Sequence, residues 1–495
     1  MNIERQTVLI LSLPNFDRRY LYQKEMGSGY GYRSLRPSKF HDEPRKIYPI
    51  AELQYAAAIV KDEGHNVVLD DDQYRDSIDI EEYKISLKKR CKSPSVIFVR
   101  TSLPTLFYDL EIGEDIKKIY PNVPLYIFGP LFSAPEFIDF VKTNKTYDGL
   151  ITSEIEAVIS KIINKKDPKE IPGFYYKKDG NYICHNNERA LANMEKLPLP
   201  SYESVDYKKI DRFIIHSSRG CPKACNYCPY YISQGGNFRS KTAERTFEEI
   251  KYLVENFKAK KLVIHDPIFT LDKNRIIKLC ELLAEAKLNI TWECETHMDH
   301  LDPPLIALMY KAGLRLLAYG VESANKDVLK KARRGFKNWK KLKENIDAAK
   351  EIGIVTRAYF ILGLPGDNIE GAYASIELAK FIGSDISQFS LPNPYPGTEM
   401  FRNGLRDGWL DKQKYDNDKE LFYRSLGTHG HNEPSMTEHY NSLQAKYIKC
   451  IANHEMINQG ENGIKKIVRR FKIISYETAL QGIDKIQKIR KSLSS

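Results

Sequence analysis

The sequence lacks any apolar run long enough to cross a membrane. Its longest apolar stretch, Val123 to Phe132, is interrupted by Gly129 and Pro130, whereas a spanning helix needs about 20 consecutive apolar residues. A secretory leader is missing too, because no basic region precedes the short apolar run Val8 to Leu13, which ends at Pro14. The sequence therefore predicts a cytoplasmic protein without a transmembrane segment.

Cysteine is scarce, and neither internal repeats nor low-complexity tracts occur. Only eight of the 495 residues are cysteines, and three of these fall in one short stretch. The others are dispersed: Cys91, Cys184, Cys280, Cys294 and Cys450. This distribution excludes the disulfide framework of a small secreted protein. The hydrophobic share of 42% and charged share of 28% are typical of a globular protein, and the length allows two or three domains.

The formal net charge of +11 is unevenly distributed along the chain. Between Ile464 and Ser495, nine Lys or Arg residues stand against only Glu477 and Asp484. Such a segment is typical of a solvated amphipathic helix, and contact with nucleic acid or a lipid surface is the alternative. We expect the helix and do not expect nucleic acid as a partner.

Three cysteines lie within eight consecutive residues, Cys221-Pro-Lys-Ala-Cys225-Asn-Tyr-Cys228, directly after Gly220. Thiolates so close along the chain are suited to binding one inorganic centre. A [4Fe-4S] cluster takes four ligands, so three cysteines leave one iron without a protein ligand. The alternatives are structural cysteines, or a tetrahedral zinc site that needs a fourth ligand such as His216 or His265.

Strands and helices alternate over the first third of the chain. The predicted strands are Thr7 to Leu13, His65 to Asp70, Ser95 to Arg100, Pro124 to Phe128 and Gly149 to Thr152, and the predicted helices are Pro49 to Gly64, Asp109 to Ile119, Ala134 to Val141 and Ile155 to Ile163. This order predicts an α/β domain with a parallel, doubly wound sheet, whose ligand lies at the carboxyl ends of the strands. A hairpin turning at Asp179-Gly180 and a proline-rich linker, Leu197 to Pro200, should follow.

A second alternation begins at Phe213. Its predicted strands are Phe213 to Ser217, Lys261 to His265, Ile290 to Glu295, Leu314 to Gly320, Val355 to Leu362 and Ile386 to Leu391, with helical patterns between them. Beyond Met400 no clear period appears until about Ser442. The histidines there (His429, His431 and His439) suit a solvated or substrate-lining loop, with a metal cluster as the alternative.

The motif C-x-x-x-C-x-x-C, with Tyr227 before its last cysteine, resembles the signature of the radical S-adenosylmethionine (SAM) superfamily. The pattern of the first third resembles the cobalamin-binding Rossmann domain that precedes many radical SAM domains. The resemblance implies a Rossmann-like domain at 1–170, a linker at 171–208, a partial (β/α)6 radical SAM barrel at 209–400 and a small, mostly helical cap at 401–495. Catalytic groups then belong at the carboxyl ends of the barrel strands.

The same resemblance implies which residues contact the cofactors. Cys221, Cys225 and Cys228 would bind a [4Fe-4S] cluster, and SAM would meet residues at the strand ends: Tyr227, Asp266, Glu293, Glu322, Ser323, Arg357, Gly363 and Gly366. Alternatives stay open, because Glu322 can instead pair with an Arg or Lys, Asp266 can cap the following helix, and the Gly363 to Gly366 segment can be a plain turn. Cys294 alternates with Glu293 and Glu295, which predicts that it packs on the other face.

For cobalamin, the resemblance places contacts at the ends of the Rossmann strands, namely Thr101, Ser102, Gly129, Pro130, Ser153 and Glu154. These positions are also natural turns and helix caps. No D-x-H-x-x-G motif occurs in the sequence, so we expect no histidine ligand on the lower face of cobalt. His65 is expected to be a turn residue.

The resemblance implies a cobalamin-dependent radical SAM enzyme, in which a 5′-deoxyadenosyl radical activates an unactivated carbon of a small molecule or natural product for methylation. A flavodoxin or ferredoxin would supply the electron. The alternatives are a cobalamin enzyme that rearranges, cyclises or oxidises without methylation, and a tRNA-modifying methylthiotransferase. The latter needs a second set of cysteines, and only Cys91 and Cys184 precede the motif.

Overall fold

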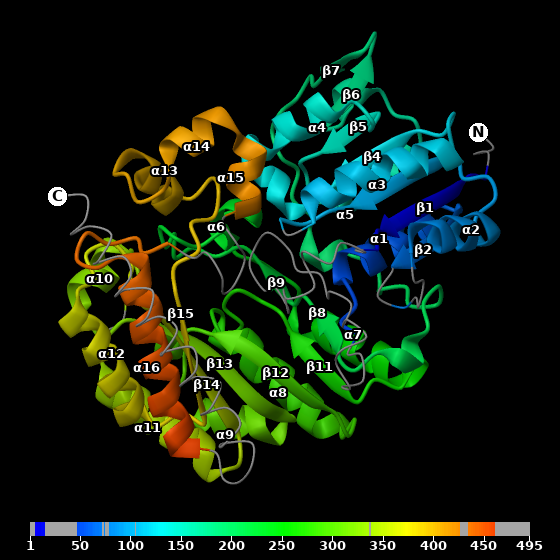
Figure 1. Ribbon diagram of the computed structural model, residues 1–495. Coiled ribbons are helices and arrows are strands. Elements are labelled where there is room, and N and C mark those ends of the chain that lie inside the picture. Colours follow the sequence, from blue (N-terminus) through cyan, green and yellow to red (C-terminus); the bar gives the residue numbers. More distant parts are fainter. Residues whose placement is uncertain are drawn as a thin grey trace, which may run out of the picture. The chain divides into compact units, whose positions relative to one another are not determined.

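The computed structural model describes residues 5–14, 47–71, 74, 79–103, 105–335, 338–425 and 434–460. Contacts divide the chain into two compact units, which are described separately (Figure 1). Unit 1 comprises Met1–Ala224, Cys228–Pro267 and Glu285–Thr291, and unit 2 comprises Cys225–Tyr227, Ile268–Ala284 and Trp292–Ser495. The division therefore falls within the segment that the sequence predicts to be a barrel.

Unit 1 contains a seven-stranded sheet in the order β2-β1-β3-β4-β5-β6-β7. Its strands are β1 (Thr7–Ser12), β2 (Asn66–Asp71), β3 (Val96–Arg100), β4 (Leu125–Phe128), β5 (Gly149–Ile151), β6 (Phe174–Lys178) and β7 (Asn181–Ile183). The first five are parallel to one another. Residues 8–12 and 96–100 are fully buried, as the continuous apolar runs of a sheet covered on both faces require. The parallel α/β sheet is thus confirmed.

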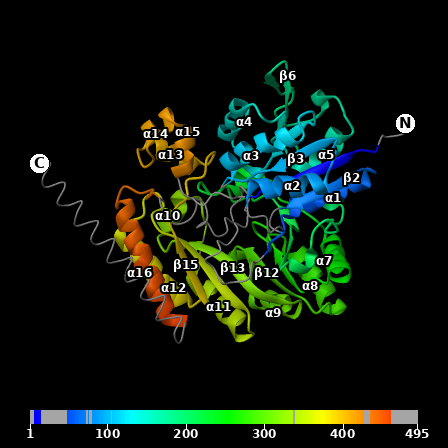
Figure 2. The ribbon, with the colours of Figure 1, turned by 45° about the vertical axis from the view of Figure 1, so that its right-hand side comes forward.

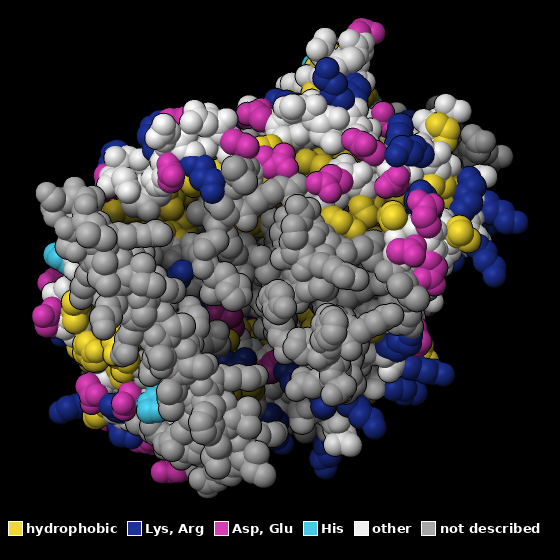
Figure 3. Space-filling model, viewed as in Figure 1, with side chains coloured by type: hydrophobic (Ala, Val, Ile, Leu, Met, Phe, Trp, Pro, Cys, Tyr) yellow, Lys and Arg dark blue, Asp and Glu magenta, His cyan; other side chains and the backbone are white. Residues whose placement is uncertain are grey.

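The helices of this sheet are α1 (Ala51–Asp62), α2 (Ile80–Arg90), α3 (Leu106–Ile119), α4 (Ile138–Asn144) and α5 (Ile155–Ile163). Helix α1 packs on α5, and α2 packs on α3. The sequence pattern missed α2 because only Tyr83 and Leu87 of that helix are buried, while Ile85 is 72% exposed. Acidic and basic side chains are interspersed over unit 1 on the face that Figure 3 shows.

The predicted hairpin forms between β6 and β7, with positive φ at both Asp179 and Gly180, as a two-residue turn of the mirror-image type requires. Strand β6 pairs antiparallel with β5, which the sequence pattern did not indicate. The proline-rich linker packs into a core as well. Leu197 is buried in a cluster with Ala51, Tyr55, Ala192, Met194 and Ile214. The linker is therefore part of unit 1 and not a free spacer.

Unit 1 also holds β8 (Phe213–Ile215), β9 (Ser218–Arg219), α6 (Tyr230–Ser233), β10 (Arg239–Ser240), α7 (Ala243–Phe257) and β11 (Lys261–Ile264). Strands β8 and β11 are parallel, whereas β9 and β10 are antiparallel. The predicted strand Phe213 to Ser217 thus ends early. Its physical reason is that the amide of Ser217 donates to the Asp266 carboxylate at 2.8 Å instead of continuing a strand ladder.

In unit 2, β12 (Thr291–Thr296, whose first residue belongs to unit 1), β13 (Leu314–Glu322), β14 (Val355–Ile361) and β15 (Ile386–Ser390) pair in parallel in that order. The helices that alternate with them are α8 (Lys273–Ala286), α9 (Pro303–Lys311), α10 (Lys326–Lys331), α11 (Trp339–Glu351) and α12 (Ile369–Ile382). Figures 1 and 2 show α9, α11 and α12 along one side of this sheet. Cys294 is buried on β12 between two more exposed glutamates, as predicted.

The C-terminal part of unit 2 is helical, with α13 (Glu399–Arg406), α14 (Lys412–Asn417), α15 (Lys419–Ser425) and α16 (Ser442–Gly460). The sequence shows no clear period before Ser442, yet three helices, each of eight residues or fewer, form there, in agreement with the mostly helical C-terminal part that was predicted. Short helices with mixed surfaces leave little periodicity in a sequence. His429, His431 and the basic segment from Ile464 lie outside the described residues. Within the described part of the chain, no helix is long and apolar enough to span a membrane.

Candidate functional site

The cysteine motif lies between β9 and α6, and the backbone before it is tightly constrained. Gly220 has φ +88, and a Cβ there would collide with the carbonyl oxygen of Asn237. The next amide, that of Cys221, donates to the Gly235 carbonyl at 3.1 Å. Only glycine meets both the left-handed φ and the close approach, so the sequence Gly-Cys fixes the entry to the motif.

Cys225 belongs to unit 2 and is buried beside a cation. The guanidinium of Arg334 forms a hydrogen bond with its sulfur, and the Cys225 thiol donates to the Arg333 carbonyl at 3.8 Å. The following residue is anchored too, because the Asn226 side chain donates to the Lys331 carbonyl at 3.0 Å.

Glu322 ends β13 next to this cysteine. Its backbone has φ +69, and the pairing of β13 with β14 is irregular between Gly320 and Glu322. The carboxylate lies 3.6 Å from Arg334 Nη2 and forms a hydrogen bond with Tyr227. Burial raises the pKa of Glu322, while Arg334 and Tyr227 oppose the shift. The ion-pair alternative considered for Glu322 is therefore present, and its partner is Arg334.

The donor set at the motif fits an iron-sulfur cluster. None of the three cysteines forms a disulfide bond, and within the described ranges no three His, Cys, Asp or Glu side chains are placed so that they could hold a single metal ion. A mononuclear zinc site needs such an arrangement, and neither His216 nor His265 provides the fourth ligand for one. In a [4Fe-4S] cluster each thiolate binds a different iron, so the sulfur atoms need not converge on one point.

Asp266 is fully engaged by the chain that leads into the motif. It is buried, and it accepts hydrogen bonds from the amide of Ser217 at 2.8 Å and from the hydroxyl of Ser218 at 2.7 Å. It does not cap the following helix, because Asp272 accepts from the amide of Arg275 there. Asp266 thus holds the β8–β9 junction.

The predicted glycine segment after β14 is held by internal contacts. Gly363 has φ +86, and its amide donates to Asp367 Oδ2 at 2.9 Å. The hydroxyl of Tyr440 donates to the same oxygen at 2.7 Å. Gly366 has φ +82, and a Cβ there would collide with Lys331. Ser323, the neighbour of Glu322, is buried and accepts from the amide of Asn325 at 3.1 Å. These contacts agree with the plain-turn alternative for the glycines.

One face of the β12–β15 sheet carries charged groups. The register brings Glu293 and Glu295 of β12 to the same face as Arg357 and Tyr359 of β14, and Tyr359 and Arg357 form a hydrogen bond. Ala318 and Gly320 of β13 stand between them and take up little room. Glu295 remains exposed to solvent in spite of the surrounding protein. Solvent still reaches the side chain, but the protein packed around the carboxylate reduces its hydration, which raises the pKa of Glu295 to about 7, and the Glu322 carboxylate adds to the shift.

This pKa predicts a pH dependence of stability that Glu295→Gln removes. Folded protein keeps the Glu295 proton up to about pH 7, whereas an unfolded glutamate loses it near pH 4.5. Since the folded state binds more protons between these values, the contribution of Glu295 to the free energy of unfolding falls as pH rises through this window. Between pH 5 and pH 8 the melting temperature of Glu295→Gln should therefore rise relative to that of the wild type. If the melting temperatures of the two proteins differ by the same amount at every pH in this range, the raised pKa of Glu295 is contradicted.

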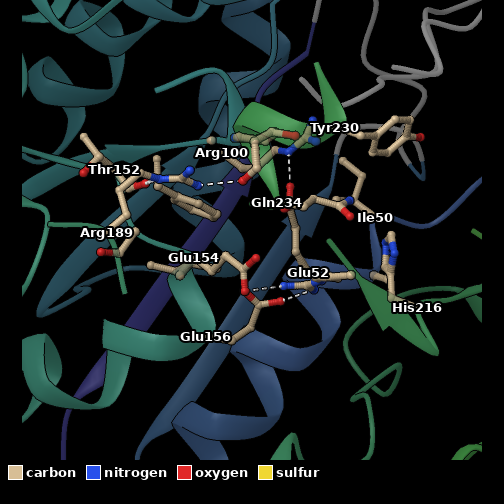
Figure 4. Close-up of a pocket in the computed structure, with 18 of the residues that line it drawn as sticks. Ile50, Glu52, Arg100, Thr152, Glu154, Glu156, Arg189, His216, Tyr230 and Gln234 are labelled. Carbon is tan, nitrogen blue, oxygen red and sulfur yellow. Dashed lines mark hydrogen bonds and ion pairs between the residues drawn. The ribbon is translucent and has the colours of Figure 1, made fainter. Parts of the chain in front are cut away.

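A pocket in unit 1 lies at the carboxyl ends of β4 and β5 and is partly open to solvent (Figure 4). Four of the six residues predicted for cobalamin line it: Gly129, Pro130, Ser153 and Glu154. Thr101 and Ser102 are buried and are not among its lining residues. Ser153 donates to the Pro172 carbonyl at 2.7 Å, and Glu154 pairs with Arg219 and Arg239, so both side chains are already engaged.

Two buried hydroxyls at this edge have no hydrogen-bond partner among the described residues: Ser12 Oγ, on the last residue of β1, and Thr101 Oγ1, on the residue after β3. Unpaired buried polar groups are costly, and a water, an ion or a polar ligand is among the partners that can satisfy them. Gly129 matters for the same edge, because a Cβ there would collide with the Thr101 carbonyl oxygen. The residues present thus fit a polar cofactor at the strand ends.

His216 and His265 lie at the other side of this pocket, with ring centroids 5.4 Å apart. Burial lowers the pKa of both imidazoles, so they are neutral at physiological pH. His65, by contrast, accepts from the amide of Gln6 and contacts Asn164. It is therefore the turn residue that the sequence predicts.

Sequence reasoning missed Arg189, Arg219, Arg334 and Glu295. Arg219 had a usable signal, because it stands next to Gly220 and Cys221. The alternation of Glu295 with Cys294 also placed it on the face of Glu293. Nothing in the sequence pattern linked Arg334 or Arg189 to the motif, since their partners are distant in the chain.

Comparison with known proteins agrees with this arrangement. Residues 215–379 match the model of the radical SAM superfamily. The chain is 25% identical over 372 residues to an uncharacterized methyltransferase of Pyrococcus horikoshii, covering 73% of this chain and 80% of that one. It is 22% identical over 389 residues to an anaerobic magnesium-protoporphyrin IX monomethyl ester cyclase of Rubrivivax gelatinosus, covering 74% and 68%.

A similar fold occurs in a solved structure of the radical SAM methyltransferase TsrM from Kitasatospora setae with cobalamin and a [4Fe-4S] cluster bound. The TM-score is 0.66 at 16% identity, and the match covers 82% of this chain and 78% of that one. Another structure of the same enzyme contains a tryptophan substrate. The three cysteines lie inside residues 215–379, which match the radical SAM superfamily model, and this part of the chain follows a parallel α/β sheet.

Proposed function

We propose that this protein is a cobalamin-dependent radical SAM methyltransferase that acts on an unactivated carbon of a small molecule. The observation that carries the proposal is the three-cysteine motif in a chain whose parallel sheet also offers a pocket at its strand ends. Cys221, Cys225 and Cys228 would hold the cluster, and the pocket at Gly129, next to the strand end at Thr101, would hold cobalamin. These cofactors supply the radical and the methyl group.

The residues of the chain would position SAM and keep the cluster loop in place. Glu322, held by Arg334 and Tyr227, lies beside Cys225 and would accept a hydrogen bond from SAM. Glu293 and Arg357 face the same side of the unit 2 sheet and would bind the amino and carboxylate groups of SAM. Asp266 would act through Ser217 and Ser218, because both hold its carboxylate.

A non-methylating cyclisation or oxidation is the second candidate, and the cyclase relative favours it. Such a reaction needs a group that accepts a proton from the substrate. Glu295, with a pKa of about 7 and access to solvent, meets that need at neutral pH. Coproducts distinguish the candidates, because methyl transfer releases S-adenosylhomocysteine together with 5′-deoxyadenosine, and the second candidate releases 5′-deoxyadenosine alone.

Supporting partners follow from the same chemistry. Reduction of a cluster needs an external electron donor, for which a flavodoxin or ferredoxin is suited. A reducing compartment such as the cytoplasm protects both the cluster and the free thiols. The substrate is proposed to be a small molecule, in keeping with the tryptophan bound to TsrM.

The cobalamin part of the proposal predicts a spectroscopic result. Because no D-x-H-x-x-G motif occurs in the chain, the protein loaded with cobalamin and reduced to cobalt(II) should show no nitrogen superhyperfine splitting in electron paramagnetic resonance. His65→Ala should leave the spectrum unchanged, since His65 contacts Gln6 and Asn164. Nitrogen splitting, or no cobalamin bound after anaerobic loading, would refute this prediction.

A further inference from the structure

The chain segment after β5 is tied to the residue that precedes the cysteine motif. Arg219 Nη2 donates to Glu156 Oε1 at 2.6 Å, and Arg219 Nη1 lies 3.2 Å from Glu154 Oε2. All three side chains are at least nine-tenths buried. Charged groups at this depth persist when they are paired and hydrogen-bonded, so this contact fixes the position of Arg219, two residues before Cys221.

The same segment is tied to the helix that follows the motif. Arg189 Nε donates to the Thr152 carbonyl at 2.7 Å, and its two terminal nitrogens donate to the carbonyls of Ile232 at 2.9 Å and Ser233 at 2.7 Å. Ser233 is the last residue of α6, which begins two residues after Cys228. Figure 4 shows Arg189 and Thr152 side by side at the pocket.

A third arginine, Arg239, links the same segment to the residue after α6. Arg239 Nη2 donates to Glu154 Oε1 at 2.7 Å and to the Gln234 carbonyl at 3.0 Å. The side chain of Gln234 in turn accepts from the amide of Gly220 at 3.1 Å. Residues 152–156, here called the β5 segment, thus reach both ends of the cysteine motif through three separate arginines.

The β5 segment also lines the pocket. Thr152, Glu154 and Glu156 of the segment, together with Arg189, Arg219 and Gln234, are pocket-lining residues. A molecule in the pocket therefore meets the same side chains that hold the cysteine motif. An ion pair that only stabilised the fold would not need to line the pocket and hold the cysteine motif at the same time.

We propose that the β5 segment positions the cysteine motif and couples the pocket to it, with Glu154, Glu156, Arg189 and Arg219 as positioning residues. Binding in the pocket then stabilises the cluster-bearing loop, and cluster assembly strengthens binding in the pocket by the same factor, because coupling between two sites is reciprocal. The identity of the two ligands, cobalamin and a [4Fe-4S] cluster, rests on the proposed function.

The test uses the full chain under anaerobic conditions, with Glu156→Gln and Arg219→Lys as variants. Glu249→Gln is the matched control, because Glu249 pairs with Lys241 in a fully buried ion pair of unit 1 and lines no part of the pocket. The first measurement, made without cobalamin, is hydrogen exchange in the peptide covering 220–233 together with the resonance spectrum of the reduced cluster. The second is the affinity for hydroxocobalamin with and without the reconstituted cluster.

In the wild type, we expect cluster assembly to tighten hydroxocobalamin binding by at least about fivefold, the lower end of typical coupling. Glu156→Gln should bring this ratio close to one and alter the cluster spectrum while iron content is retained. Arg219→Lys, which keeps the positive charge, should retain part of the affinity ratio and of the wild-type cluster spectrum. Glu249→Gln should match the wild type in both.

Two results would overturn the proposal: a Glu156→Gln protein with unchanged exchange, spectrum and affinity ratio, or a Glu249→Gln control that is altered as strongly. Failure of the proposed function is recognised separately. If the wild type binds no hydroxocobalamin, the cobalamin assignment and the coupling both fall. The exchange and spectra measured without cobalamin still decide whether the β5 segment positions the motif.

Discussion

Replacing Cys221, Cys225 and Cys228 together with alanine is expected to abolish the iron-sulfur chromophore and all SAM cleavage. Each thiolate is proposed to bind a separate iron, and the triple variant leaves the cluster without protein ligands. Cys280 and Cys294 cannot substitute, because they are buried at 0% and 3% exposure within packed elements. Iron and sulfide content, the visible spectrum and release of 5′-deoxyadenosine measure the effect.

Cys280→Ala and Cys294→Ala are the matched controls for this experiment. Each removes a buried thiol from α8 or β12 without touching the motif. Both variants should keep their iron and their SAM cleavage, at the cost of a modest loss of stability from the cavity left behind. A triple variant with full iron content would show that the cluster assignment is wrong.

Arg334→Met is expected to have the second largest effect. The guanidinium of Arg334 pairs with Glu322, donates to the Gly320 carbonyl at 2.8 Å and contacts the sulfur of Cys225. Its removal leaves a buried carboxylate without its cation, which costs about 3–5 kcal/mol. The free energy of unfolding should fall by that amount. SAM cleavage should fall at least about tenfold, because Glu322 loses the partner that positions it for SAM, and a loss of about 1.4 kcal/mol in transition-state stabilisation already gives that factor.

A second substitution separates stability from function at this pair. Adding Glu322→Met to Arg334→Met removes the unpaired charge, and replacement of a buried ion pair by apolar groups is often neutral for stability. The double variant should therefore recover most of the unfolding free energy but not SAM binding. Arg315→Met, on the exposed side of the same strand, should stay within about 0.5 kcal/mol of the wild type. Recovery of SAM binding in the double variant would contradict a role for Glu322 in holding SAM.

The strands of both sheets were predictable because their apolar runs are short and are bounded by glycine, proline and polar residues. The motif Cys221 to Cys228 was predictable for a different reason, since its ligands are neighbours in the chain and need no knowledge of the fold. Helix α2 was not, because a helix that buries only Tyr83 and Leu87 leaves almost no apolar period.

The partners of the site residues were harder to predict than the residues themselves. Glu322 stood out as a carboxylate at the end of an apolar strand, and an arginine or lysine partner was anticipated. Which arginine it is depends on the irregular pairing after Gly320 and on the turn after α10 that presents Arg334. Arg189 and Glu154 likewise find their partners through tertiary contacts that leave no local pattern.

The central claim, methyl transfer from SAM to carbon, is tested most directly with methyl-deuterated SAM. The cluster- and cobalamin-loaded protein is incubated anaerobically with a reductant and a small-molecule extract of its source cells, and the products are examined by mass spectrometry. The proposed function predicts a product in which a trideuteromethyl group has replaced a hydrogen, formed together with S-adenosylhomocysteine and 5′-deoxyadenosine. A transformed product without the label, accompanied by 5′-deoxyadenosine but no S-adenosylhomocysteine, would contradict it.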